Sequence, residues 1–455
     1  MKSIKQIVFP AFIVFLAFSF SCTAPTKEKE PVEITSTYPD KIKNLTIYEV
    51  NVRQMTPEGT FKAFETHLPR LKKMGVGILW FMPIHPIGIE NRKGSLGSYY
   101  SVRDYRGVNP EFGTIEDFKN LLEKSHEMGF EVIIDWVGNH TSWDHAWMAE
   151  KPDFYTRDST GNVIPPVADW SDVADLNYDN KELWDYMISD MKYWTNEIGI
   201  DGFRCDAAPW LPGEFWVKAI QELEAEKDLL MLAEGEGPEW HEAGFDMTYA
   251  WEYHHIMNGI VRGEKNVVDL AEYMEKELSS YPNGGYRLIF TSNHDENSWA
   301  GTVKERFGDA VKTFAALSFT YYGYPLIYSG QEAGMDKRLR FFDKDTISWE
   351  DLSMQSFYHE LIQLRKDDPA IWNGDEGGNP EIINIDNLEN VLAFSRISGT
   401  NSVIGFFNLS DTEQSFSVKE SVIGDYVDLI SDNQYYINGQ APITLPPWGF
   451  MILSN

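Results

Sequence analysis

The 455-residue chain contains only two cysteines, Cys22 and Cys205, and little positive charge for its length. Lys and Arg together number 39 against 70 Asp and Glu, which gives a formal net charge of -31. A field of this sign repels phosphate backbones, so we expect no nucleic-acid partner. Two cysteines allow at most one internal disulfide, so the fold depends mainly on its hydrophobic core.

The N-terminus lacks an apolar run long enough to cross a membrane. Lys2 and Lys5 precede the apolar run Ile7–Phe20, which is too short for a span but fits the hydrophobic region of a signal peptide. The run ends at Cys22, which follows a serine as at a lipoprotein cleavage site. We therefore predict a lipoprotein signal peptide over residues 1–22 with lipidation of Cys22; a plain secretory signal is the alternative.

Lipidation would place the protein in the cell envelope, bound to a membrane through Cys22. Thr23 does not supply an Asp-type retention signal, which favours the outer membrane, on its periplasmic or cell-surface side. Residues 23–42 are polar and are expected to form a flexible tether. The oligomeric state cannot be read from the sequence.

From Lys43 onward, short apolar runs alternate with longer amphipathic segments. This alternation predicts an α/β fold, a closed (β/α)8 TIM barrel, with a doubly wound sheet as the alternative. The expected strands are Ile47–Val52, Val76–Met82, Phe130–Asp135, Ile200–Cys205, Leu229–Glu234, Phe245–Tyr249, Tyr286–Thr291 and Tyr324–Ser329.

Two segments interrupt or follow this alternation. Within the predicted barrel of residues 43–374, the stretch 141–178 has no clear periodicity and is expected to be an inserted loop subdomain after the third strand. Beyond it, residues 375–455 contain short alternating strands and predict a C-terminal all-β sandwich. Aromatic residues make up 14% of the chain, and their flat faces suit sugar rings as well as a large core.

Four carboxylates stand at the C-terminal ends of predicted strands, where barrel enzymes place their active sites. They are Asp135, Asp206, Glu234 and Asp295. Glycoside hydrolysis needs two carboxyl groups beside the scissile bond, about 5 Å apart in retaining enzymes. Arg204 shares a strand face with Asp206, so we expect it to keep this carboxylate ionised, while an apolar strand should raise the pKa of Glu234.

The four segments that carry these carboxylates resemble the four sequence regions of the α-amylase family of glycoside hydrolases. Further similar segments run from Ile47-Tyr48-Glu49 to Leu445-Pro446-Pro447-Trp448-Gly449, so that the resemblance covers Lys43–Leu453. It implies a retaining glycoside hydrolase that cleaves α-glucosidic bonds, mainly α-1,4, in starch-derived glucans or malto-oligosaccharides. No organic cofactor is implied.

The resemblance also implies roles for individual residues. Asp206 matches the nucleophile, Glu234 the acid/base and Asp295 the third carboxylate. Residues expected to bind substrate are Tyr100, Asp135, His140, Arg204, Trp210, Asn293 and His294. Asn139 and Asp175 match two ligands of a structural Ca²⁺ ion, and calcium accepts such oxygen donors.

One departure from the family and several alternatives stay open at the level of sequence. Glu236, two residues after Glu234, is a second candidate for the acid. The segment Ala207-Ala208-Pro209-Trp210 differs from the family's usual Lys-His, so the product pattern does not transfer. A transglycosylase or isomerase could use the same residues, and a non-catalytic glycan-binding protein is a further alternative, although such a protein would normally have lost a carboxylate.

Overall fold

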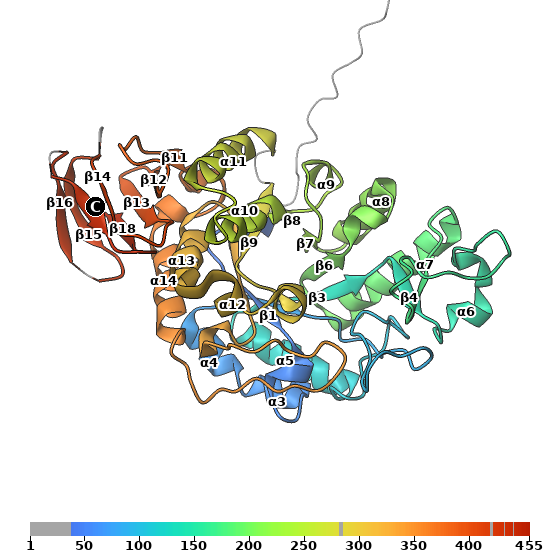
Figure 1. Cartoon of the computed structure of the whole chain (residues 1–455). Coiled ribbons are helices and arrows are strands. Elements are labelled where there is room, and N and C mark those ends of the chain that lie inside the picture. Colours follow the sequence, from blue (N-terminus) through green and yellow to red (C-terminus); the bar gives the residue numbers. More distant parts are fainter. Residues whose placement is uncertain (1–37, 282–284, 419–421, 432, 440) are drawn as a thin grey trace, which may run out of the picture. The chain divides into compact units, whose positions relative to one another are not determined.

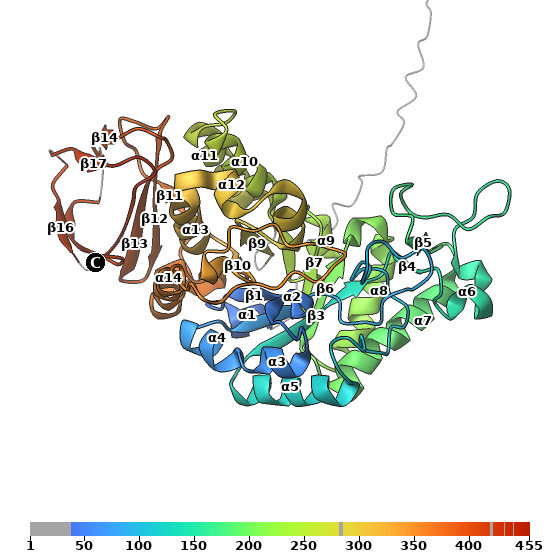
Figure 2. The same cartoon turned by 60° about the horizontal axis from the view of Figure 1, so that its bottom comes forward.

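The computed structural model describes residues 38–281, 285–418, 422–431, 433–439 and 441–455. Among these residues, eight parallel strands close into a barrel in the order β1-β10-β9-β8-β7-β6-β3-β2 (Figures 1 and 2). The predicted barrel is therefore confirmed, and every predicted strand is present. The strands are β1 (Ile47–Val50), β2 (Ile78–Phe81), β3 (Glu131–Val137), β6 (Gly202–Asp206), β7 (Leu230–Ala233), β8 (Met247–Tyr249), β9 (Tyr286–Phe290) and β10 (Tyr324–Tyr328).

Both faces of these strands are buried, as expected for a parallel sheet covered by helices. Side chains at alternate positions form the barrel interior, for example Ile133 on β3 and Leu232 on β7. Side chains at the intervening positions, such as Phe203 and Cys205 on β6, pack outward against the helices. Because side chains alternate, Arg204 between them points into the barrel.

The helices lie around the ring of strands (Figure 2). They are α2 (Val52–Met55), α3 (Phe61–Glu65), α4 (Leu68–Met74), α5 (Ile115–Glu127), α7 (Lys181–Lys192), α8 (Gly213–Glu224), α9 (Glu239–Glu242), α10 (Trp251–Val261), α11 (Val267–Ser280), α12 (Val303–Phe307), α13 (Val311–Thr320) and α14 (Gln355–Asp367). The amphipathic stretch Phe61–Met74, whose periodicity predicts a single helix, is not one helix. It is two helices, because Pro69 occupies the first turn of α4 and cannot continue α3.

The predicted tether also needs correction. Residues 38–42 form helix α1 (Tyr38–Ile42), in which Tyr38 and Ile42 are buried in the cluster that fills the barrel interior. Tyr38 also hydrogen-bonds Glu131, and Lys41 forms an ion pair with the same carboxylate at 2.8 Å. An apolar pair one helical turn apart thus anchors this segment. The predicted signal peptide, Cys22 and the rest of the tether lie outside the described residues.

The inserted segment forms a small substructure beside β3. Strands β4 (His140–Ser142) and β5 (Val173–Asp175) pair antiparallel, and the short helix α6 (Trp147–Glu150) lies between them in sequence. In the register His140 stands opposite Asp175. The hairpin therefore brings the two ends of the insert together next to the C-terminal end of the barrel.

The C-terminal strands form the predicted all-β domain, drawn in red in Figure 1. A six-stranded antiparallel sheet and the pair β14-β17 share a core that includes Phe406 and Phe416. Arg396 on this domain donates to the carbonyls of Thr320 and Tyr321 at the end of α13. Its strands are β11 (Glu381–Ile382), β12 (Val391–Ser398), β13 (Asn401–Asn408), β14 (Gln414–Phe416), β15 (Gly424–Asp428), β16 (Gln434–Ile437), β17 (Ile443–Leu445) and β18 (Phe450–Ser454).

Among the described residues, no helix combines the length and the apolar character that crossing a membrane requires.

Candidate active site

Three of the predicted carboxylates meet at the guanidinium of Arg204. Nη1 lies 2.9 Å from Asp135 Oδ1 and 3.0 Å from Asp206 Oδ1, and Nη2 lies 2.8 Å from Glu234 Oε1. Tyr249 OH accepts from Nε at 3.2 Å. We call Asp135, Arg204, Asp206 and Glu234 the carboxylate cluster. It lies at the C-terminal ends of β3, β6 and β7, as the barrel rule requires.

The cluster members differ in their access to solvent. The side chains of Asp135 and Arg204 are fully buried, whereas Asp206 and Glu234 expose 13% and 18%. Asp135 and Arg204 therefore form the buried floor of the cluster, and the other two carboxylates face outward from this floor. Both contact the same guanidinium, at 3.0 and 2.8 Å, so the two carboxylates can reach the same bond of a substrate.

The pKa values within the cluster differ from the sequence-based expectation. Burial and the negative charge of Glu234 raise the pKa of Asp206 well above its usual range, despite Arg204. Burial alone would raise the pKa of Glu234, but Arg204 and the Ala207 N–H, which donates to Glu234 Oε2 at 2.8 Å, outweigh burial and lower it. The expectation missed that Arg204 also pairs with Glu234. Asp206 and Glu234 each shift the pKa of the other, so the two carboxyls titrate as a pair.

Glu236, the second candidate for the acid, is held away from the cluster. It forms an ion pair with Arg287 and accepts from the Glu252 N–H at 3.1 Å. Arg287 stands on β9 between Tyr286 and Leu288, which point into the barrel, so Arg287 points outward. Glu236 is thus committed to a contact outside the barrel, which leaves Glu234 as the acid candidate.

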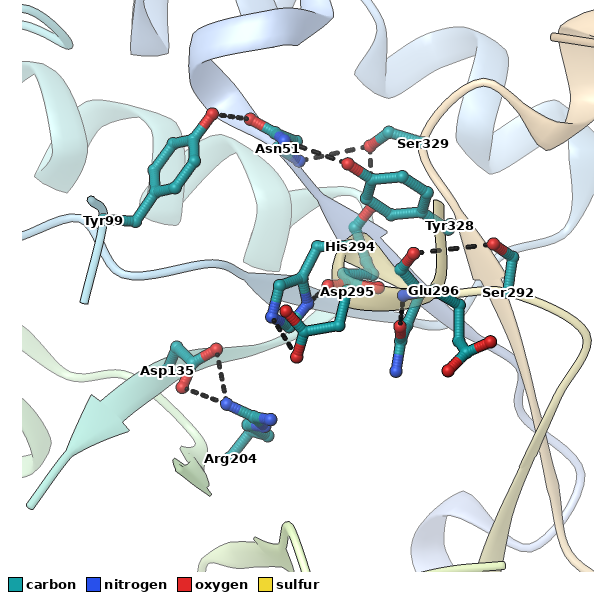
Figure 3. Close-up of polar contacts among 12 residues, drawn as sticks. Asn51, Tyr99, Asp135, Arg204, Ser292, His294, Asp295, Glu296, Tyr328 and Ser329 are labelled. Carbon is teal, nitrogen blue, oxygen red and sulfur yellow. Dashed lines mark hydrogen bonds and ion pairs between the residues drawn. The ribbon is translucent and has the colours of Figure 1, made fainter. Parts of the chain in front are cut away.

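Asp295 and His294 follow β9 and lie across from Asp135 and Arg204 (Figure 3). His294 Nε2 is 3.4 Å from Asp295 Oδ2 and 2.7 Å from the hydroxyl of Tyr100, which itself donates to Asp135 Oδ2 at 3.0 Å. The Tyr100 and His294 rings stack with centroids 5.4 Å apart. Tyr100 and His294 together therefore connect the carboxylate cluster to Asp295.

The remaining predicted residues surround this arrangement. His140 is buried and hydrogen-bonded by Asn139 at 3.2 Å, and burial lowers its pKa to about 4, so its ring is neutral. The Asn293 side-chain oxygen accepts from the Glu296 N–H at 2.8 Å, which caps the turn after Asp295. Asn293 thus has a local structural role, and no contact joins it to the carboxylate cluster in the described chain.

Trp210 lies on the turn after β6, three residues after Ala207, whose N–H donates to Glu234, and is 51% exposed. Its ring stacks on Trp170 of the insert, with centroids 5.3 Å apart and an interplanar angle of 10°. Trp170 in turn packs against the edge of His140. The two exposed indoles therefore offer an apolar surface at the turn that also contacts Glu234 through Ala207, and a sugar ring can stack on such a surface.

The candidate calcium ligands are neighbours at the base of the insert. Asn139 precedes His140, which pairs with Asp175, and the Leu176 N–H donates to the Asn139 carbonyl at 3.1 Å. Asp175 is half-buried, and burial raises its pKa. The described residues hold no group of three or more His, Cys, Asp or Glu that could bind a metal. A calcium ion held by Asn139 and Asp175 would therefore need the rest of its ligands from carbonyls and water.

Sequence reasoning missed Glu49, Tyr249 and Trp170. Glu49 on β1 contacts His294 Nδ1 at 2.5 Å, and Tyr249 ends β8 against Arg204. Both could have been found by the rule applied to the four carboxylates, since each stands at the C-terminal end of a strand and points inward. Trp170 carried no such signal, because its neighbour Trp210 lies 40 residues away in a different connection.

Comparisons with known proteins agree with this geometry. A family model described as the alpha amylase catalytic domain matches residues 31–162 and 167–387. A second model, the maltogenic amylase C-terminal domain, matches residues 381–452. The two matches together cover most of the chain and both of its folded parts.

Relatives and solved structures extend the match. Alpha-amylase 2 of Dictyoglomus thermophilum is 25% identical over 83% of this chain and 68% of its own length. The chain spans 58% of the length of the alpha-amylase MalA of Haloarcula japonica, at 25% identity over 85% of this chain. A maltogenic alpha-amylase structure from Thermotoga neapolitana superposes with a TM-score of 0.83 at 30% identity, over 91% of this chain and 99% of that one. An alpha-amylase structure from Lactobacillus plantarum gives 0.82 and 29%, with the same coverages.

Proposed function

Because the chain belongs to the alpha-amylase family, whose members act on α-glucans, we propose that it is a retaining glycoside hydrolase that cleaves mainly α-1,4 bonds in starch-derived glucans or malto-oligosaccharides. The observation that carries the proposal is the carboxylate cluster. The Arg204 guanidinium contacts both Asp206 and Glu234, and the two carboxylates face outward from the buried pair Asp135 and Arg204.

In the first step, Asp206 attacks the anomeric carbon while Glu234 gives a proton to the leaving oxygen. The C–O glycosidic bond breaks as the bond to Asp206 forms, so the departing chain leaves with the proton and a covalent β-glycosyl-Asp intermediate remains. The step requires one proton on the Asp206–Glu234 pair, and it must be on Glu234. Because the pKa of Asp206 is raised and that of Glu234 is lowered before substrate binds, we propose that contact of Glu234 with the glycosidic oxygen moves the proton there.

In the second step, Glu234 acts as a base. It takes a proton from water, whose oxygen bonds to the anomeric carbon as the bond to Asp206 breaks, and Asp206 and the protonated Glu234 are regenerated. The product keeps the α configuration because the carbon is inverted twice. Asp295 and His294 bind sugar hydroxyls, Asp135 holds Arg204 in place, and Tyr100 provides the aromatic surface beneath the reacting sugar.

A second candidate function is transglycosylation, in which a sugar hydroxyl replaces water in the second step; isomerisation within one α-glucoside would use the same intermediate. The stacked surface of Trp170 and Trp210 favours this candidate, because an apolar platform on the side of Glu234 would hold an acceptor sugar and exclude water. A non-catalytic glycan-binding role is disfavoured, since Asp206, Glu234 and Asp295 are all present.

The function is tested by incubating protein lacking residues 1–22 with maltoheptaose, pullulan and isomaltotriose, and following the anomeric signals by NMR. The proposal expects α-anomeric products that later mutarotate, with α-1,4 bonds cut fastest. Longer oligosaccharides would move the assignment to transglycosylation. Initial β-anomers, or no turnover of any of the three by folded protein, would reject it.

We further propose that Cys22 carries a lipid that anchors the protein in the outer membrane of the cell envelope. The support is the apolar run before Cys22 and the absence of an Asp at position 23. Metabolic labelling with a fatty acid, compared between the natural protein and Cys22→Ser, tests the anchor, and fractionation of the two membranes tests its place. We also propose that Asn139 and Asp175 bind a structural Ca²⁺ ion.

A further inference from the structure

Glu49 is a buried carboxylate that the proposed reaction does not use. It stands on β1 two residues after Ile47, whose side chain lies in the barrel interior, so Glu49 also points inward. Its side chain is fully buried, and Oε1 is 2.5 Å from His294 Nδ1. The other oxygen, Oε2, is buried without a hydrogen-bond partner among the described residues. A fully buried carboxylate is costly unless something pairs with its charge, and here that partner is His294.

The backbone around Glu49 is fixed by its own hydrogen bonds. The Ser329 hydroxyl and N–H both donate to the Glu49 carbonyl, at 2.6 and 3.1 Å. Asn51 then connects Ser329 to Tyr99 and Tyr328, as Figure 3 shows. The carboxylate therefore has little freedom to turn away from His294.

The hydrogen bonds that His294 makes with Tyr100 and Glu49 indicate which of its ring nitrogens are protonated. Tyr100 has one hydroxyl proton, and that proton is donated to Asp135 Oδ2. The contact between Tyr100 OH and His294 Nε2 then needs its proton from Nε2. A second proton lies in the contact between His294 Nδ1 and Glu49. Each ring nitrogen of His294 therefore takes part in a hydrogen bond that contains its own proton.

We propose that Glu49 is a positioning residue that keeps His294 protonated at Nε2, so that this N–H, which donates to the Tyr100 hydroxyl in the free protein, is held as a donor for a sugar hydroxyl beside Asp295. This inference rests on the proposed function, in which His294 binds a sugar hydroxyl. Glu49 does not touch substrate; it acts through the histidine ring, in the way that a buried carboxylate orients a catalytic imidazole.

The electrostatic surroundings of His294 agree with this role. Burial lowers the pKa of the ring, but the charges of Asp295 and Glu49 and the hydrogen bond to Glu49 outweigh burial and raise the pKa to about 9. The ring is also held in place by Tyr100, stacked on it, and by Trp80, whose ring meets it edge-on. The other charged or titratable groups that act on it are Tyr100, Asp135, Arg204, Glu234 and Asp295.

The test follows the ring directly, by NMR titration of ¹⁵N-histidine-labelled protein, with the His294 signals identified by their absence in His294→Gln. In the natural protein both ring nitrogens of His294 are expected to stay protonated up to about pH 9. In Glu49→Gln, which keeps the shape but removes the charge, the midpoint is expected to fall by about two pH units or more, to the ordinary histidine range or below.

Kinetics provide the second readout. With malto-oligosaccharide as substrate, kcat/KM of Glu49→Gln is expected to fall about tenfold at pH 8 and to stay within about threefold of the natural enzyme at pH 6, as one lost charge on a histidine implies. The matched control is Glu332→Gln, since Glu332 is also fully buried but pairs with Arg70 and Tyr48 away from His294. It should change stability and leave the pH profile in place.

A His294 midpoint near 6.5 in the natural protein, or the same midpoint in Glu49→Gln as in the natural protein, would overturn the inference. If Glu49→Gln does not fold, the titration of the natural protein still decides. Because that titration needs no substrate, it separates a failure of this inference from a failure of the proposed hydrolase activity.

Discussion

Two buried arginines in this barrel are each surrounded by carboxylates, and only one of them lies where a substrate can reach its partners. Arg204 on β6 points into the barrel and contacts Asp135, Asp206 and Glu234. Arg287 on β9 points outward and contacts Glu236 and Glu277. Side chains along a strand alternate between the inside and the outside of the barrel. Arg204 occupies an inward position and Arg287 an outward one, and this difference separates a candidate active site from a structural ion pair.

The two arginines also differ in the charge balance around them. The guanidinium of Arg204 faces three carboxylates, so its cluster holds an excess of negative charge, which raises the pKa of Asp206. Arg287 faces two carboxylates, and Tyr281 covers it by a cation–π contact at 4.1 Å from the ring centroid. Residue type and burial alone therefore do not identify a candidate active site; the larger excess of carboxylates around an inward-pointing arginine at the strand ends does.

The largest expected effect comes from removing a carboxylate from each arginine. Asp206→Asn should lower kcat by about 10⁴-fold or more, because the nucleophile is lost. Glu277→Gln should keep kcat within a few-fold but destabilise the fold by about 3 kcal/mol, since it leaves Arg287 short of one buried partner. Steady-state kinetics and denaturant unfolding of both variants check this. Comparable kcat losses in the two variants would contradict the assignment of Arg204 to a candidate active site and of Arg287 to a structural ion pair.

A smaller effect separates the two glutamates that lie two residues apart. Glu234→Gln should lose about 10²- to 10⁴-fold in kcat on malto-oligosaccharides, the usual worth of a general acid. It should keep most of its first-step rate on α-maltosyl fluoride, since fluoride leaves without a proton. Glu236→Gln should behave as the natural enzyme on both substrates. The assignment is wrong if the two variants exchange these profiles.

The tryptophan surface predicts a moderate effect on acceptor use. Trp210→Ala should raise KM for long maltodextrins up to about tenfold, equivalent to 1.4 kcal/mol, and lower the ratio of transfer to hydrolysis products. The measurement is chromatography of products at high oligosaccharide concentration. Tyr436→Ala, which removes a 64% exposed aromatic ring on β16 of the C-terminal domain, is the matched control and should change neither value.

Calcium removal is expected to have the smallest effect. If Asn139 and Asp175 bind Ca²⁺, EDTA should lower Tm by a few degrees and added CaCl₂ should restore it, because a ligand that binds only the native state stabilises it. Asp175→Asn should no longer respond to EDTA. A Tm that does not change on chelation, or an unchanged response in Asp175→Asn, would remove calcium from this account.

Much of the fold was predictable because its signals are local. Continuous apolar runs such as Val76–Met82 predicted buried strands, and Asp206 and Glu234 stood where such runs end. The split of Phe61–Met74 was also visible in principle, through Pro69. Helix α1 was not, because the burial of Tyr38 depends on a barrel interior built from residues far along the chain.

The pairing of side chains was the part that the sequence could not supply. Arg204 was expected beside Asp206, two residues away, but its contact with Glu234 crosses from β6 to β7 and reverses the expected pKa order. The contact of Glu49 with His294 joins β1 to the loop after β9, and that of Trp170 with Trp210 joins two loops. Such contacts depend on closure of the barrel, which places distant strand ends side by side.

The most direct test of the central claim is to trap the covalent intermediate. The protein would be treated with 5-fluoro-α-D-glucosyl fluoride, digested, and examined by mass spectrometry. A fluoroglucosyl group on the peptide that contains Asp206, and its absence in Asp206→Asn, is the result expected if Asp206 is the nucleophile of a retaining hydrolase. A label on Glu234 or Asp295 instead, or turnover of the fluoride to β-anomeric product with no label, would contradict the account.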